Sequence, residues 1–425
     1  MRTRILMLVI VVLSLGDFVL QGIVPSITRG KSDFTDPFVA GWIWRHGSNP
    51  HDVVQATRSG RNLTGSSMRV VAIYPPTAYL MVSPLTFLQW KWANFVFTVL
   101  ETLAACGTAA CVVAISGRSL RESQAWIVFA AVLAFASFHT ALHVANISVI
   151  TAGLSALLIC LASRGKYFSA GVLLAVAAGL KPHVGIWLIA FYALKRKWRL
   201  VWAGSLSGIF LLVIAVVRIG LPVKVLVSNY RANLHNWFRP GGENDFSLAN
   251  PLRFELANLQ VALDPWLGYS GAYILAFGLA ALGIGLWIYA VHRNPKCSTP
   301  LAVSSLLALT FLPIYHRVYD TAILTLALAW IFETERIESD RKQKILKRIS
   351  KVLFFLLMLP IQSVAVRAQS YLSQAELHSW WWNLVIAPYT SWILLAFSAV
   401  LLYALLISSR PEDPEAHPFE AATAG

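Results

Sequence analysis

Charged residues are scarce in this sequence. Lys, Arg, Asp and Glu make up 13% of the 425 residues, which is about half their share in an average soluble domain. Hydrophobic residues make up 57%. With so few charged residues, the solvent for most of the chain must be lipid, so the composition predicts an all-α integral membrane protein.

Cysteine is also rare, and its placement excludes a disulfide framework. Cys106, Cys111 and Cys160 lie in apolar runs, and Cys297 lies in a short basic segment. Acidic residues are outnumbered, giving a net charge of +15. The basic residues form small clusters between apolar runs, which is typical of membrane-topology signals and not of nucleic-acid binding. We therefore expect no nucleic-acid partner.

Twelve apolar runs predict membrane-spanning helices. They cover residues 5–24, 92–116, 124–142, 146–162, 168–180, 184–194, 201–219, 271–291, 301–313, 319–332, 352–366 and 389–406. The first run is interpreted as an uncleaved span, because no small-x-small cleavage pattern follows it. An even number of spans places both termini on one side of the membrane.

Basic residues predict the orientation, because cytoplasmic turns are enriched in Lys and Arg. With cytoplasmic termini, each inner turn carries at least two basic residues. The loops 25–73, 220–270 and 367–388 then face the outside. We expect one polytopic domain, 1–408, in the cell membrane, and a disordered cytoplasmic tail, 409–425.

The segment 74–90 is too rich in proline for an ordinary span, since it contains Pro75, Pro76 and Pro84. The alternation of inner and outer turns holds only if this segment does not cross the membrane. It is predicted to be a re-entrant or interfacial element. Tyr74, at its start, is a possible substrate-binding residue, although a structural role is the simpler interpretation.

Two aspartates follow the first span. A carboxylate of Asp33 or Asp36 near the outer surface can take a proton from a hydroxyl nucleophile. The same residues are good helix caps ahead of Pro37, which would then take the first helical position. The sequence leaves both roles open.

Lys181, Pro182 and His183 form a turn between two short spans. Pro182 is suited to begin a helix, and a helix N-terminus beside a lysine ammonium is an anion site. Phosphate is the expected anion at Lys181, with His183 as a possible substrate-binding residue. The alternative is a lysine whose ammonium reaches the membrane surface.

A second polar turn contains Tyr315, His316, Arg317 and Asp320. Polar groups at membrane depth are costly without a partner. His316 and Arg317 can neutralise a phosphoryl leaving group, with Asp320 pairing Arg317. A purely structural Arg317–Asp320 ion pair is the alternative.

Other polar groups also fall on the predicted outer face. His139 and His143 have zinc-compatible spacing, but no third ligand is nearby, so polar recognition with Asn146 is favoured over metal binding. The second outer loop mixes aromatic and polar residues, which suits carbohydrate contact but is also ordinary loop composition; they are Tyr230, Arg231, His235, Asn236, Trp237 and Glu243 to Asp245. Arg231 and His235 are the possible substrate-binding residues among them. No metal site and no cofactor are expected.

These features together predict transfer from an anionic lipid-linked donor to an acceptor hydroxyl. The donor would be held at its phosphate while a base activates the acceptor. A transporter or flippase of a lipid-linked sugar is the alternative. Such a protein would carry polar residues through several spans on both halves, whereas the inner half here offers little beyond Asp17 and Glu101.

The motifs Asp33-Phe34, Tyr74-Pro75-Pro76, Asn146 before an apolar helix, Lys181-Pro182 and Tyr315-His316-Arg317 occur in this order. With these motifs in this sequence order, the protein resembles glycosyltransferase family 87, the polyprenyl-phosphate-mannose-dependent α-mannosyltransferase-like proteins. The resemblance implies the C-type glycosyltransferase fold and inverting hexosyl transfer, with mannose favoured. The donor would be a polyprenyl-phosphate sugar and the acceptor a membrane lipid or glycan.

The resemblance also implies roles for individual residues. Asp33 would be the general base. Lys181 and Arg317 would hold the donor phosphate, and His316 would orient or neutralise it. The active site would face the extracytoplasmic side of the membrane.

Overall fold

The computed structural model describes residues 2–28, 33–333 and 341–408, and their regular structure is helical. Within these ranges there is no β-strand, only one isolated bridge between Leu256 and Arg317. The all-helical class predicted from composition is thus confirmed. The predicted tail, 409–425, lies outside the described residues.

Five helical stretches are long and apolar enough to cross a membrane. They are α1 (Arg2–Asp17) with its continuation into α2 (Val24–Thr28), α6 (Trp90–Ile115), α12 (Trp198–Val217), α14 (Gln260–Arg293) and α20 (Tyr389–Ser408). A sixth is formed if the pair α7 (Ser123–Leu133) and α8 (Ala136–Val144), bent by 45°, counts as one broken span. The chain is therefore built as a membrane protein, but twelve spans are not confirmed.

The other predicted spans correspond largely to short apolar helices. These are α9 (Ser148–Ser163), α10 (Tyr167–Leu180), α11 (Pro182–Leu194), α15 (Thr299–Phe311) and the run of η4 (Val318–Leu326) and α16 (Ala327–Ile331). Helices of this length reach about 20–24 Å, short of a hydrocarbon core of about 30 Å. Helix α15 is buried on nearly every side, so its all-round apolarity reflects a place inside the bundle.

The predicted span 352–366 is wrong. Helix α17 (Arg341–Met358) ends there and α18 (Ile361–Gln369) begins after Leu359 and Pro360. Proline cannot donate the backbone hydrogen bond that would continue the first helix. Six of the 18 residues of α17 are also basic, which does not suit a membrane core.

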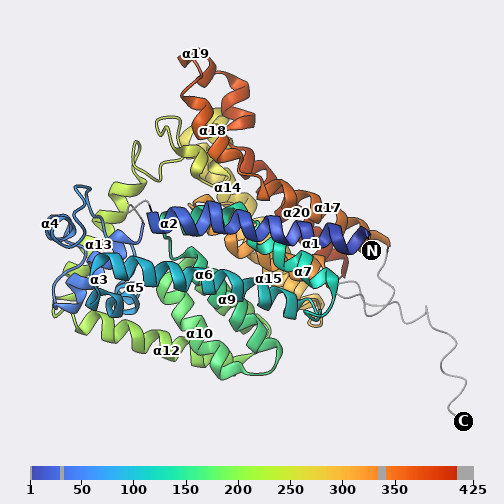
Figure 1. Ribbon diagram of the computed structural model, residues 1–425, viewed down its shortest axis with the longest axis horizontal. Helices are drawn as coiled ribbons and strands as arrows, with labels where there is room; N and C mark the ends of the chain where they lie inside the picture. Colours follow the sequence, from blue (N-terminus) through green and yellow to red (C-terminus); the bar gives the residue numbers. More distant parts are fainter. Residues whose placement is uncertain (1, 29–32, 334–340, 409–425) are drawn as a thin grey trace, which may run out of the picture.

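Several short helices gather at one end of the molecule, where α2 finishes. They are α3 (Thr35–Arg45), α4 (Val53–Thr64), α5 (Pro76–Val82), η2 (Ser83–Phe87) and α13 (Val223–Phe238). The start of α1 lies at the opposite end of the long axis (Figure 1). With 7 and 5 residues, α5 and η2 are too short to cross a bilayer, as predicted for segment 74–90.

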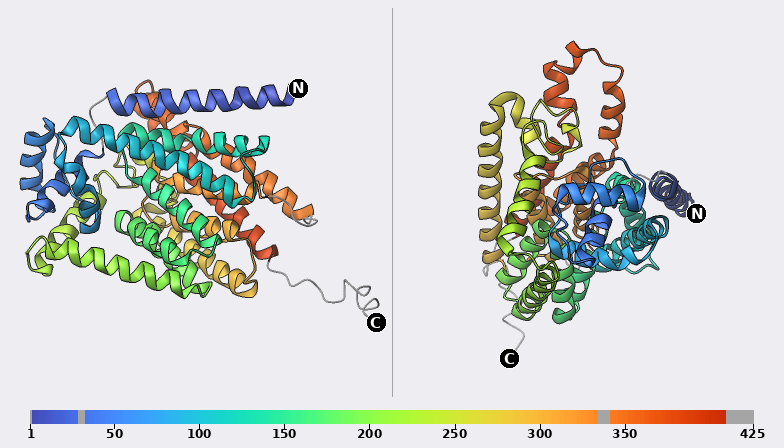
Figure 2. Two further views of the ribbon diagram at one scale, coloured as in Figure 1. Left: turned by 60° about the horizontal axis from the view of Figure 1, so that its bottom comes forward. Right: turned by 90° about the vertical axis from the view of Figure 1, so that its left-hand side faces the viewer.

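The segment from α18 through α19 (Gln374–Leu377) and η5 (Trp382–Ile386) projects sideways from the body of the protein (Figure 2). Figure 2 also shows α1 lying along the outside of the bundle. By contrast, α3 is packed into the end of the molecule, with Phe38 and Ile43 fully buried. This end holds both of the cavities described next.

Candidate functional site

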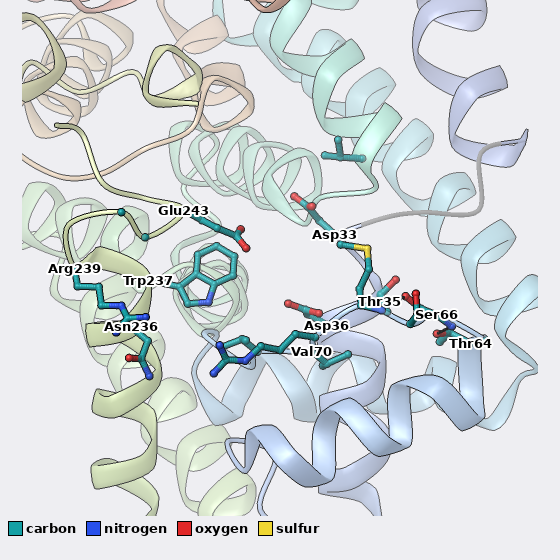
Figure 3. Close-up of a pocket in the computed structure, with 18 of the residues that line it drawn as sticks. Asp33, Thr35, Asp36, Thr64, Ser66, Val70, Asn236, Trp237, Arg239 and Glu243 are labelled. Carbon is teal, nitrogen blue, oxygen red and sulfur yellow. Dashed lines mark hydrogen bonds between the residues drawn. The ribbon is translucent and has the colours of Figure 1, made fainter. Parts of the chain in front are cut away.

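Two adjoining cavities lie at the end formed by α3, α4, α5 and α13. The larger has a volume of about 1060 Å³ and the smaller about 250 Å³. Four residues line both of them: Asp33, Asp36, Trp237 and Glu243. Figure 3 shows Asp33 and Asp36 on one side of the larger cavity, facing Trp237 and Glu243 on the other. These four residues mark the junction of the two cavities.

Asp33 is held by the turn between α8 and α9. Its backbone nitrogen donates to the carbonyl oxygen of Val144 at 2.5 Å, and Asn146 Nδ2 donates to its carboxylate oxygen Oδ2 at 2.9 Å. Ala145, between these two partners, has φ of 53°, a left-handed conformation that costs a non-glycine residue energy. The carboxylate itself is exposed to the cavities, so it is fixed in position yet accessible.

A chain of buried hydrogen bonds continues from Asp33 to Lys181. The Ser148 hydroxyl oxygen lies 2.5 Å from Asn146 Oδ1 and 2.7 Å from Asp320 Oδ1, and it accepts from Lys181 Nζ at 2.6 Å. Ser148 was not predicted from the sequence. The one local feature that could have indicated Ser148 is its position two residues after Asn146. An Asn side chain commonly accepts a hydrogen bond from the backbone nitrogen at this position, and Ser148 N donates to Asn146 Oδ1 at 3.0 Å.

Lys181 lies where α10 ends, and Pro182 begins α11 as predicted. The ammonium of Lys181 is ion-paired with Asp320 and also faces the ring of Tyr319 at 5.5 Å. The predicted pairing of Asp320 with the Arg317 side chain is therefore wrong. Asp320 instead accepts from the backbone nitrogen of Arg317 at 3.1 Å.

The Arg317 guanidinium lines the smaller cavity and pairs with two other carboxylates. Its Nη1 lies 2.8 Å from Glu255, and its Nη2 lies 3.7 Å from Glu243. The Glu243 side chain is 64% exposed. The outer partner of Arg317 can thus exchange with another anion at little cost, because a solvated carboxylate gains little from such a pair.

His316 lies behind the cavity wall and not on its surface. It is buried, with its ring stacked on Phe311 at 3.9 Å between centroids. Its Nδ1 is 3.6 Å from Asp320 Oδ2, beyond hydrogen-bond range. His183, 4.7 Å from His316 between ring centroids, does line the smaller cavity.

Neither Asp33 nor Asp36 caps α3. The helix begins at Thr35, its N-cap is Phe34, and Pro37 is its third residue. Asp36 accepts a hydrogen bond from the backbone of Val71, and burial raises its pKa to about 8, with the charge of Asp33 acting in the same direction. At neutral pH the Asp36 carboxyl is therefore largely protonated.

The remaining predicted residues are divided between the cavities and other places. Tyr74 lines the smaller cavity and His143 the larger. His139 instead joins α8 to the first helix, with Nδ1 3.3 Å from Asp17 and Nε2 2.7 Å from the carbonyl oxygen of Leu133. In the described ranges no group of three His, Cys, Asp or Glu side chains is arranged to hold a metal.

Helix α13 carries the first part of the segment that was predicted as the second outer loop, and only some of its polar and aromatic residues face the site. Arg231 and His235 are exposed and line neither cavity. Tyr230, Leu234 and Trp237 line the smaller cavity. The sequence pointed to the right segment, since Tyr230, Trp237 and Glu243 all line the smaller cavity. Arg231 and His235, the two residues of this segment predicted to bind substrate, do not.

A family model for glycosyltransferase family 87 matches residues 72–314, which is more than half of the chain. The matched region contains Asn146, Ser148 and Lys181, whereas Asp33 precedes it and Arg317 follows it. No match was found among curated proteins. Of the two functions expected from the sequence, this match supports the enzyme and not the transporter. The chain belongs to glycosyltransferase family 87 and is a membrane glycosyltransferase.

Proposed function

We propose that this enzyme transfers a hexose, mannose being the favoured sugar, from a polyprenyl-phosphate donor to a hydroxyl of a membrane lipid or glycan. The reaction would take place on the extracytoplasmic face of the cell membrane. One observation carries the proposal: the carboxylate of Asp33 lies at the junction of two cavities, and the smaller of them is lined by Lys181 and Arg317.

This arrangement supports a single displacement. Asp33 takes the proton of the acceptor hydroxyl as its oxygen attacks C1 of the donor sugar. The bond between C1 and the phosphate oxygen breaks, and its electron pair remains on the phosphate. Attack from the side opposite the leaving group inverts the configuration at C1. The Asn146 hydrogen bond occupies one oxygen of Asp33 and leaves the other to face the acceptor.

The leaving phosphate needs positive charge, and the two candidate cations differ in how freely they can supply it. Lys181 is paired with Asp320, whose side chain is only 7% exposed. Arg317 is paired with Glu243 and Glu255, which are 64% and 34% exposed. We therefore assign the main phosphate contact to Arg317, with Lys181 supporting it from the buried network. Two fixed cations can stabilise a monophosphate leaving group in this mechanism without a metal ion.

The cavities suit the two substrates by size and lining. The smaller cavity, with Leu180, Leu234 and Ile314 beside its cations, suits the phosphate and first isoprene units of the donor. The larger is lined by polar residues, including Thr35, Ser66 and Asn236, which suits the hydroxyl-rich head of an acceptor.

The test is Asp33→Asn in protein reconstituted into lipid nanodiscs. Transfer of labelled mannose from polyprenyl-phosphate mannose to a lipid extract of the native membrane is measured. We expect a loss of about 10²–10⁴-fold, the usual contribution of a general base. Glu376→Gln, which changes an exposed carboxylate outside both cavities, is the control and should retain transfer. Full activity in Asp33→Asn would remove the general-base assignment.

A further inference from the structure

The junction of the two cavities combines an aromatic face with carboxyl groups. Trp237 comes from the end of α13, Glu243 from the loop that follows, and Asp36 from the first turn of α3. In Figure 3 the indole of Trp237 and the carboxylate of Glu243 lie opposite Asp33 and Asp36. Among the residues that the structure describes, these four line both cavities and no others do.

The loop after α13 is folded so that Glu243 remains beside Trp237. The backbone nitrogen of Asn244 donates to the carbonyl oxygen of Trp237 at 3.0 Å, and that of Gly242 donates to Arg239 at 2.8 Å. A Cβ added at Gly242 would lie only 2.5 Å from the Trp237 carbonyl oxygen. The tight turn therefore requires glycine at this position. It fixes the backbone of Glu243 close to that of Trp237, and we call these two side chains the Trp237–Glu243 unit.

The chemistry of this unit fits a pyranose ring. A sugar presents C–H groups on one face, which pack on an indole, and hydroxyls at its edge, which donate to carboxylates. Asp36 can form a second kind of contact with a sugar hydroxyl, because its protonated carboxyl group both donates and accepts hydrogen bonds. In the described part of the chain no Lys, Arg or His side chain forms an ion pair with Asp36, so the group is available to a ligand.

We infer that Trp237, Asp36 and Glu243 form the subsite for the sugar ring of the donor. This inference rests on the proposed function, in which C1 of that sugar lies between the phosphate site and the acceptor. The sugar at the junction would have its phosphate directed toward Arg317 in the smaller cavity. Its C1 would then be open to an acceptor hydroxyl arriving from the larger cavity, beside Asp33.

Glu243 connects the subsite to the phosphate site. Its carboxylate is 3.7 Å from Arg317 Nη2 while also lining the junction. A donor phosphate that takes its place on Arg317 would release this carboxylate toward the sugar hydroxyls. Binding of the phosphate and of the sugar would then support each other through one side chain.

The experiment compares two lipid probes, polyprenyl-phosphate mannose and the same polyprenyl phosphate without sugar. Binding of each is measured in nanodiscs for the wild type, Trp237→Ala and Trp237→Phe. Trp266→Ala, which removes a 68% exposed tryptophan from α14, is the matched control and should bind both probes as the wild type does.

We expect Trp237→Ala to weaken binding of the sugar-bearing probe about tenfold, the upper range for one aromatic contact, and to leave the sugar-free probe unchanged. Trp237→Phe should recover most of the loss. Equal weakening of both probes, or no weakening of either, would overturn the inference while leaving the proposed function intact. A wild type that binds neither probe would overturn both.

Discussion

The ammonium of Lys181 and the carboxylate of Asp320 are both almost fully buried, at 8% and 7% side-chain exposure. A buried ion pair adds little net stability over apolar residues, but removing one member leaves the other charge without a partner. The pair is further tied to Asp33 through Ser148 and Asn146. A change at Lys181 therefore acts on the fold of the site before it acts on any bound phosphate.

Lys181→Ala is expected to lower the free energy of unfolding by about 3–5 kcal/mol, because Asp320 becomes an unpaired buried charge. The double change Lys181→Ala with Asp320→Ala should cost less than this single change. The measurement is reversible unfolding in detergent micelles, followed by tryptophan fluorescence. A free energy of unfolding that instead falls in the double variant by the sum of the losses in Lys181→Ala and Asp320→Ala would show that the two side chains do not stabilise each other. That result would contradict the ion pair.

The sequence predicted those site residues whose setting is local. Pro182 after Lys181 indicated a helix start, and Asp33 followed an apolar run; both features lie within a few neighbouring residues. Partners that come from distant parts of the chain could not be predicted in this way. Asp320 and Lys181 are 139 positions apart, so pairing Asp320 with nearby Arg317 was the simplest local choice, and it was wrong.

Helix α13 illustrates the same limit at the scale of one element. Its mixed polar and aromatic composition predicted contact with a ligand, but composition does not say which face of a helix is turned inward. The structure turns Tyr230, Leu234 and Trp237 toward the smaller cavity, a spacing of three to four residues on one side. Arg231 and His235 are exposed and line neither cavity.

Helix α10, which carries Lys181 at its end, is held against α12 by a close backbone approach. A Cβ added at Gly171 would lie 2.6 Å from the carbonyl oxygen of Leu200 and 2.8 Å from the backbone nitrogen of Gly204. Because backbone atoms cannot move aside as a flexible side chain can, even alanine must separate the two helices. The position of Lys181 thus depends on a contact some ten residues away along its helix.

Gly171→Ala is expected to destabilise the protein by about 1–3 kcal/mol, the usual cost of overpacking. Gly107→Ala is the matched control in α6, since a Cβ there has nothing within 4 Å. This second change should be neutral or stabilising by up to about 1 kcal/mol, because alanine is the better helix former. Both are compared by thermal unfolding in one detergent, and equal effects of the two would contradict the close approach of α10 and α12.

On the scale of the whole molecule, apolar runs located the helices well, but twelve membrane spans are not confirmed, since five or six helical stretches are long and apolar enough to cross. Runs such as α10, α11 and α15 are apolar because they are surrounded by other helices or by lipid, and the sequence does not distinguish these surroundings. Length does distinguish them, because helices of 13–14 residues reach only about 20 Å. The short helices end at Lys181 and before Tyr315, and these polar turns therefore line the smaller cavity.

The arrangement of the two ends yields a prediction of orientation. Helices α3, α4 and α13, whose residues line the cavities, lie at one end of the long axis, and the start of α1 lies at the other (Figure 1). Helix α6 runs 26 residues from η2 to the turn before α7, or about 39 Å. If the basic inner turns are cytoplasmic, Ser67 and Ser228 face the outside and Ser119 the inside. All three are exposed.

Each serine is changed to cysteine in a background in which Cys106, Cys111, Cys160 and Cys297 are replaced. Ser67→Cys and Ser228→Cys should react with a membrane-impermeant maleimide in intact cells, and Ser119→Cys only after permeabilisation. The three substitutions are chemically identical, so differences in labelling report sidedness alone. The reverse pattern would place the cavities on the cytoplasmic side, where Asp33 and Arg317 would meet a different pool of donor and acceptor.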